Sequence, residues 1–140
     1  VLKRFDGDIS SVFSLPVDEA RSVLQTLPGV GPKTSDVVLL FHGRMPVIPI
    51  DTHIFRVSKR LGFYKDEPNY DHVRRTLESL YSQGEYLTVH LSLINLGRTL
   101  CKARGPLCLR CPLQDLCDYG KPRLQRHHGE YQDSRLECVW

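Results

Sequence analysis

Four cysteines in one short window constrain the fold of this chain more than any other feature. They are Cys101, Cys108, Cys111 and Cys117, spaced C-x6-C-x2-C-x5-C. Thiolates are good ligands for soft metals, and four of them this close in sequence can surround one centre without help from distant segments. The start of the sequence does not resemble a secretory signal, so a metal centre is a better interpretation than a disulfide framework.

The spacing of the cysteines also bears on which metal they bind. Structural zinc sites use two C-x2–4-C pairs, and only Cys108 and Cys111 form such a pair here. The wider outer spacings favour the larger [4Fe–4S] cluster, with a four-cysteine zinc site as the alternative. Lys102 and Arg104 make the window basic, which suits contact with phosphates, although ordinary solvated charge explains each of them equally well. Cys138 has no partner in the sequence pattern, and we assign it no role.

The rest of the sequence predicts an all-α protein. No stretch alternates like a strand, and no repeat of solenoid period is present. Helical spacing of apolar residues and the positions of glycine, proline and capping residues predict five helices. They are expected from about residue 16 to 27 and over residues 33–42, 53–61, 70–81 and 85–100.

A tight turn separates the first two predicted helices, in the stretch Leu27-Pro28-Gly29-Val30-Gly31. Its glycines allow the backbone to turn sharply and leave N–H groups exposed at the start of the next helix. Such amides, together with the positive end of the helix dipole, form a site for a DNA phosphate. The stretch therefore predicts a helix–hairpin–helix, although a turn of this kind can also be purely structural.

Two charged residues flank the second predicted helix and are candidates for catalysis. Lys33 lies in its first turn, where the positive field of the helix favours the neutral, nucleophilic amine. Asp51 is suited to cap the following helix, and a carboxylate held there could stabilise a sugar cation or accept a proton. Each has an ordinary alternative, as an exposed lysine and as a plain N-cap.

Composition fits these predictions without deciding between them. The chain has 140 residues, of which 41% are hydrophobic and 25% charged, as expected of a soluble globular protein. Its net charge of +3 is compatible with a nucleic-acid partner. No apolar run is long enough to span a bilayer, so we expect a cytoplasmic or nucleoid location unless a targeting signal lies upstream.

Three stretches together resemble the endonuclease III branch of the helix–hairpin–helix DNA glycosylase superfamily. They are Leu27–Thr34, Ile50–Val57, and Gly97-Arg98 leading into the cysteine window. The resemblance spans about residues 2–119 and corresponds to the C-terminal part of family members. It implies a [4Fe–4S] cluster on the four window cysteines, and it implies double-stranded DNA with a damaged base or an abasic site as the substrate.

The resemblance also implies roles for single residues. A lysine just after the hairpin marks family members that both remove a base and cut the strand, so Lys33 implies a bifunctional glycosylase and abasic-site lyase acting on oxidised pyrimidines. Its amine would attack the sugar C1′ to give a Schiff base, followed by β-elimination, while Asp51 supports departure of the base. The implied DNA contacts are Leu27, Gly29, Val30 and Gly31 in the hairpin, and Lys102 and Arg104 in the cluster loop.

The sequence departs from the family because family members have further helices before the point where it begins. Since the chain starts at Val1 and its only methionine is Met45, we expect a fragment whose N-terminal half comes from the full-length chain or another chain. Apolar faces such as Val37–Leu40 and Leu91–Ile94 are then expected to lack partners. Two alternative functions are a monofunctional glycosylase for mispaired or alkylated bases, and a cluster-bearing DNA-binding fragment that is inactive without its N-terminal half.

The expected organisation has three parts. A partial helical glycosylase domain covers residues 1–100 and contains the helix–hairpin–helix at about residues 17–42. The [4Fe–4S] cluster loop follows over residues 101–119, and a polar C-terminal tail covers residues 120–140.

Overall fold

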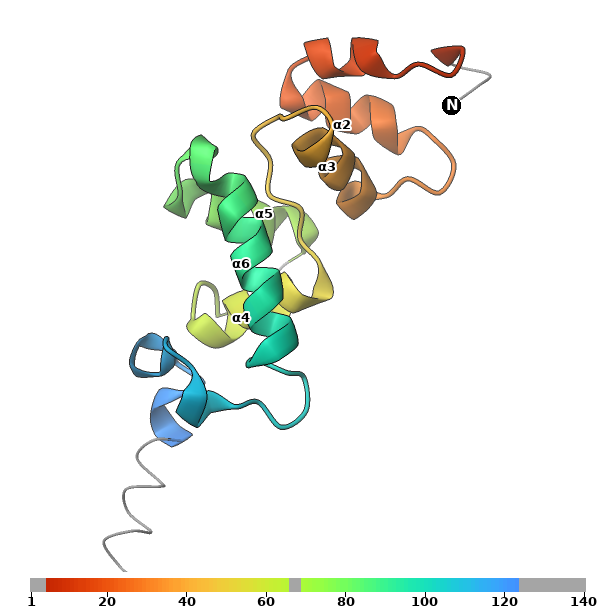
Figure 1. Ribbon diagram of the computed structural model, residues 1–140. Coiled ribbons are helices and arrows are strands. Elements are labelled where there is room, and N and C mark those ends of the chain that lie inside the picture. The colour runs from red at the N-terminus through yellow and green to blue at the C-terminus, as the bar shows by residue number, and fades with distance from the viewer. Residues whose placement is uncertain (1–4, 66–68, 124–140) are drawn as a thin grey trace, which may run out of the picture.

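The computed structural model describes residues 5–65 and 69–123, and in these ranges the chain is helical with no strand (Figure 1). Cys138 and most of the predicted polar tail lie outside the described residues. The elements in chain order are the 3-10 helix η1 (Ser10–Ser14), α2 (Val17–Gln25), α3 (Pro32–Phe41), α4 (Thr52–Leu61), α5 (Tyr70–Leu80), the 3-10 helix η2 (Gln83–Glu85), α6 (Tyr86–Thr99), and the 3-10 helices η3 (Cys108–Arg110) and η4 (Gln114–Leu116).

All five predicted helices are present, with ends that differ by a few residues. The largest difference is at the end of α2, which was expected at about residue 27 and lies at Gln25. Helix α6 was expected to begin at Glu85 and begins at Tyr86. The side chains of Ser82 and Glu85 form a capping box around η2, so this short stretch adopts a 3-10 turn before the α-helix starts. None of the helices in the described ranges is long and apolar enough to cross a membrane.

The buried apolar residues form two cores, and the boundary between them along the chain lies between Val47 and Ile48. The first core belongs to η1, α2, α3 and the segment after α3, and it ends at Val47. The second core begins at Ile48 and is built by α4, α5 and α6. The first contains Val12, Ala20, Leu24, Leu27, Leu39, Leu40, Met45 and Val47, and the second contains Ile48, Ile50, Ile54, Val57, Tyr64, Val73, Leu77, Tyr86 and Leu93.

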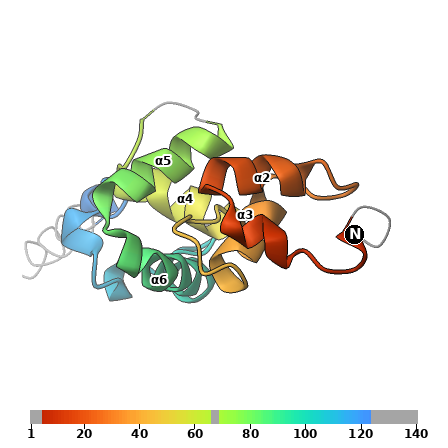
Figure 2. The same ribbon diagram turned by 90° about the horizontal axis from the view of Figure 1, so that it is seen from above.

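The two cores give the molecule an elongated arrangement. Helices α2 and α3 lie at one end, α4, α5 and α6 lie in the middle, and the cysteine loop lies at the other end (Figures 1 and 2). The segment between α3 and α4 runs from the first core to the second, so it carries the chain from the region of Lys33 to the region of Asp51.

The expected shortage of packing partners is only partly correct. Leu39 and Leu40 are buried in the first core and Leu93 in the second, so the prediction is wrong for them. Helix α2 supplies partners for α3, and helix α4 supplies partners for α6, which the linear pattern did not reveal. Leu91 does lie at the surface, with 50% of its area exposed.

Candidate functional site

The turn between α2 and α3 has the geometry of a helical hairpin. Helix α2 ends at Gln25, and the amide of Val30 donates to the carbonyl of Leu27 at 3.1 Å. Gly29 has a φ of +81°, a conformation that side chains other than glycine rarely adopt. Gly31 caps α3 in an extended conformation with a φ of −94°, and Pro32 follows at the first helical position.

The hairpin leaves open space outside its two glycines. A side chain added at Gly29 or Gly31 would meet no atom of the chain within 4 Å, and both residues are exposed. Packing within the chain therefore does not explain the absence of a side chain at Gly31. Leu27 is buried in the first core, so only its backbone can face a ligand, and Val30 is half-buried against the same core.

Lys33 and Asp51 lie on segments that belong to different cores. Lys33 is exposed in the first turn of α3. Asp51 is half-buried and caps α4, where its Oδ1 accepts from the amide of Ile54 at 2.8 Å. Burial lowers the pKa of His90, and the charges of both Asp51 and Lys33 also act on that ring. Lys33 thus lies at the start of α3 and Asp51 at the start of α4, 18 positions later in the sequence (51 minus 33).

The segment that leads into Asp51 is fixed by side chains from α5 and α6. The amide of Ile48 donates to Oε1 of Glu78 at 3.0 Å, and the amide of Ile50 donates to the Tyr70 hydroxyl at 3.1 Å. His90 Nδ1 lies 3.0 Å from the carbonyl oxygen of Pro49, which requires the proton to be on Nδ1. These side chains were not predicted as site residues, because their relation to Asp51 exists only in the folded chain.

The four window cysteines lie in one loop against the C-terminal end of α4. All four are free thiols; Cys117 is buried and the others are half-buried. Arg60 Nη1 lies 3.4 Å from Sγ of Cys101, and the carbonyl of Arg60 accepts from Sγ of Cys117 at 3.0 Å. Burial raises the pKa of the Cys108 thiol, and the positive charge of Arg123 opposes this shift.

The four thiols of this loop are chemically suited to bind a soft metal. In residues 5–65 and 69–123, no three or more His, Cys, Asp or Glu side chains are arranged to hold one metal ion. Four thiols are the ligand set of an iron–sulfur cluster and also of a four-cysteine zinc site, so the residue types fit both groups. Lys102 and Arg104 of the same loop are exposed.

Comparison with known proteins identifies relatives by sequence. The chain is 38% identical over 113 residues to an endonuclease III of Sulfolobus acidocaldarius, a match that covers 81% of this chain and 51% of the relative. It is 41% identical over 107 residues to endonuclease III of Bacillus subtilis, covering 76% of this chain and 49% of the relative. With endonuclease III of Escherichia coli K12 it shares 42% identity over 103 residues, covering 74% and 48%. No family model matches the chain.

The fold agrees with the sequence comparison. A trapped covalent endonuclease III–DNA intermediate, an estranged-adenine complex, superimposes with a TM-score of 0.76 at 39% identity, covering 88% of this chain and 54% of that one. A non-covalent endonuclease III–DNA complex gives a TM-score of 0.75 at 39% identity, covering 89% and 54%. This chain belongs to the endonuclease III family. It spans about half the length of the curated relatives it matches.

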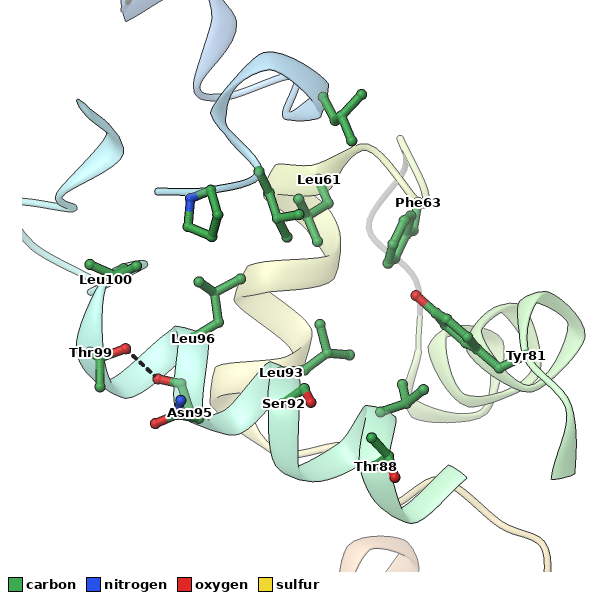
Figure 3. A pocket seen from close by; sticks show the side chains of 14 residues that line it. Leu61, Phe63, Tyr81, Thr88, Ser92, Leu93, Asn95, Leu96, Thr99 and Leu100 are labelled. Atoms are coloured by element: carbon green, nitrogen blue, oxygen red, sulfur yellow. Dashed lines mark hydrogen bonds between the residues drawn. The ribbon is translucent and has the colours of Figure 1, made fainter. Parts of the chain in front are cut away.

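One further hollow of the chain contains none of the predicted site residues. It is an open, mainly apolar pocket of about 640 Å³ between α6, the end of α4 and the cysteine loop. Leucine and aromatic side chains point into it from these elements, with Tyr81 and Phe63 at one end and Leu100 at the other (Figure 3). Its apolar lining lacks the charged groups that a DNA backbone would require.

Proposed function

We propose that this protein acts in base-excision repair of DNA, as a bifunctional glycosylase and abasic-site lyase for oxidised pyrimidines. The observation that carries the proposal is the exposed amine of Lys33 in the first turn of α3, directly after the open hairpin. Such an amine is suited to nucleophilic attack on a sugar carbon, and the carboxylate of Asp51, held as the cap of α4, is suited to accept a proton. The endonuclease III–DNA complexes among the structural relatives support duplex DNA as the partner.

In this proposal the hairpin holds one phosphate of the damaged strand. The open space outside Gly29 and Gly31 allows a phosphate to approach the backbone closely. Amides at the start of α3 would donate to it, and the positive end of the helix dipole adds to the attraction. This contact is independent of base sequence, so it sets the register of the duplex and brings the damaged nucleotide to Lys33.

The chemistry proposed for Lys33 and Asp51 begins once the damaged nucleotide has left the base stack. Asp51 stabilises the positive charge that develops on the sugar as the bond to the base breaks, and it accepts a proton from the attacking amine. The Lys33 nitrogen forms a bond to C1′ as the base leaves and takes up a proton, and the C1′–O4′ bond then opens, so that O4′ becomes a hydroxyl and C1′ an iminium, the Schiff base. On an abasic site the same amine adds to the C1′ aldehyde and water leaves. Removal of a C2′ proton then breaks the bond to the 3′ phosphate, and hydrolysis releases Lys33.

We also propose that Cys101, Cys108, Cys111 and Cys117 hold a [4Fe–4S] cluster over residues 101–119. The group would supply a rigid centre that organises the loop, with redox chemistry available to it. Its expected consequence for DNA binding is to present Lys102 and Arg104, both exposed, towards phosphates. We expect the protein to act on DNA in the cytoplasm or nucleoid.

The test is borohydride trapping on a duplex that contains one abasic site. The amine in the Schiff base becomes a stable secondary amine on reduction, so the protein stays attached to the DNA. We expect an adduct with the parent protein and none with Lys33→Ala. Strand cleavage on the same duplex distinguishes the lyase from a monofunctional glycosylase, and DNA binding without any adduct would contradict the proposal in favour of a binding module.

Asp51→Asn separates the chemical role of Asp51 from its role as a helix cap. Asparagine caps helices as well as aspartate does, so α4 should remain intact. We expect the trapping rate to fall by about 100-fold or more, because the charge and the proton acceptor are lost. An unchanged rate would remove Asp51 from the proposed mechanism and leave it as a cap alone.

A further inference from the structure

A buried polar network joins the two cores of the molecule. Arg21 on α2 donates from Nε to Oδ1 of Asp36 on α3 at 2.6 Å, and from Nη2 to Oδ1 of Asp71 on α5 at 2.9 Å. Asp36 is fully buried and Arg21 is 8% exposed. The network therefore lies inside the joint between the α2–α3 region and the α5 helix of the second core.

The Tyr70 hydroxyl occupies the centre of this joint and touches both sides. It donates to Oδ2 of Asp36 at 2.8 Å, and it accepts from the amide of Ile50 at 3.1 Å. Asp36 lies three residues after Lys33, on the same face of α3, and Ile50 immediately precedes Asp51. A single oxygen atom thus connects the helix that carries Lys33 to the segment that carries Asp51.

The protonation states support this direction of donation. Burial raises the pKa of Tyr70, so its hydroxyl keeps its proton at any physiological pH. Asp36 is fully buried; its Oδ1 accepts from Arg21 Nε, and its Oδ2 accepts from Tyr70 at 2.8 Å and from Arg21 Nη2 at 3.4 Å. The chain of donors therefore runs from the Ile50 amide to Tyr70 and from Tyr70 to Asp36.

Stability alone is a poor explanation for this arrangement. A buried carboxylate and guanidinium lose so much hydration that well-packed apolar residues of similar size are often as stable or more so. The polar joint instead fixes the relative position of the segments that it connects, because hydrogen bonds have preferred distances and angles and apolar contacts do not. The two groups whose relative position it fixes are the segments of Lys33 and Asp51.

We propose that Tyr70 and Asp36 are positioning residues that set the relative placement of Lys33 and Asp51. The inference rests on the proposed function, since it assigns a role in that reaction to two residues that join the segments of Lys33 and Asp51. Neither Tyr70 nor Asp36 needs to touch DNA. Tyr70 acts through the Ile50 amide on Asp51, and Asp36 acts through α3 on Lys33.

The test compares Tyr70→Phe with Tyr64→Phe in the full protein. Tyr64 is a matched control: it belongs to the second core, is 8% exposed, and donates to the carbonyl of Phe55 at 2.6 Å, away from the segment before Asp51. With saturating abasic-site duplex, we expect Tyr70→Phe to slow borohydride trapping by about 10–100-fold, because small misplacements of reacting groups have effects of this size. DNA affinity should stay within about twofold of the parent, the pattern of a residue that acts after binding.

A second measurement reports on the joint without using activity. Hydrogen exchange at the Ile50 amide should be slow in the parent and in Tyr64→Phe, and faster by at least about tenfold in Tyr70→Phe, because its acceptor is gone. A trapping rate in Tyr70→Phe equal to that of the parent, or an equal loss in Tyr64→Phe, would overturn the inference.

The conservative variant Asp36→Asn completes the test. The amide oxygen of the introduced asparagine can still accept from Tyr70, whereas a leucine side chain cannot. We therefore expect Asp36→Leu to lose trapping rate and Asp36→Asn to keep most of it. Equal rates in these two variants would exclude a positioning role for Asp36. If the parent itself formed no adduct, the proposed function would fail, whereas Ile50 exchange would still show whether Tyr70 holds that segment.

Discussion

The two cores of the molecule differ in what they do for the residues at their edges. The first core, around α2 and α3, leaves Lys33 exposed at the start of a helix next to an open hairpin. The second core, around α4, α5 and α6, fixes the segment before Asp51 through Tyr70, Glu78 and His90. The first core therefore presents the exposed side chain of Lys33 to the solvent, whereas the second core fixes the position of the Asp51 carboxylate. The relative position of the two proposed catalytic residues therefore depends on the joint between the cores as much as on the packing within either core.

The largest effect is expected where the joint carries a buried charge. Arg21→Met leaves the carboxylate of Asp36 buried without its cation, and breaking such a pair costs about 3–5 kcal/mol. Urea unfolding should show this loss in the free energy of unfolding. Hydrogen exchange should become faster in the variant, and the increase should be larger at first-core amides such as Leu39 than at second-core amides such as Leu77.

Arg75→Met is the matched control for Arg21→Met. Arg75 is exposed on α5, so the same substitution there should change the free energy of unfolding by less than about 0.5 kcal/mol. A loss below about 1 kcal/mol in Arg21→Met would mean that water reaches the joint. The joint would then contribute little to the stability of the first core.

A smaller effect should be confined to the second core and the cysteine loop. Gly62 ends α4 with a φ of +89°, and a side chain added there would meet the carboxylate of Asp118. Gly62→Ala should cost about 1–2 kcal/mol from the left-handed backbone alone, measured as a lower thermal midpoint. Gly84→Ala is the control, since nothing lies within 4 Å of an added side chain there. Equal midpoints for the two variants would contradict the account of how α4 meets the loop.

The smallest effect concerns His90, whose lowered pKa makes stability depend on pH. Burial opposes protonation in the folded state, while the unfolded chain titrates near the ordinary value of about 6.5. Protons therefore bind preferentially to the unfolded chain. This contribution is absent above about pH 6.5 and reduces the free energy of unfolding below it, by up to about 1.4 kcal/mol per pH unit until the folded histidine also titrates.

His90→Gln isolates this contribution, because glutamine keeps an N–H donor for the Pro49 carbonyl but does not titrate. The difference in free energy of unfolding between parent and variant should shrink, or change sign, on going from pH 7.5 to about 5.5. Asp36 and Glu78 have pKa values raised by burial and act in the opposite sense, but they are common to both proteins and cancel in the comparison. A constant difference across this range would exclude His90 as the titrating group.

Local features of the structure were predictable from the sequence, and the joint was not. Capping by Asp51 and Asn69, the end of α4 at Gly62 and the hairpin at Gly29 all follow from backbone preferences that act within a few residues. The partnership of Tyr70 with Asp36 spans 34 positions and that with Ile50 spans 20, and no periodic pattern encodes it. The division of the core between Val47 and Ile48 was missed for the same reason, since both residues belong to one unbroken apolar stretch.

The open space outside Gly31 has a consequence for how variants of this protein are judged. Its φ of −94° is accessible to any residue, and no neighbouring atom would resist a methyl group there. A screen that scores only expression, solubility or melting temperature would therefore class Gly31 as freely replaceable. If a phosphate oxygen does occupy that space, the same position is intolerant in a screen for repair of DNA. Tolerance to substitution measured in the absence of DNA would therefore fail to identify Gly31 as a residue that DNA binding requires.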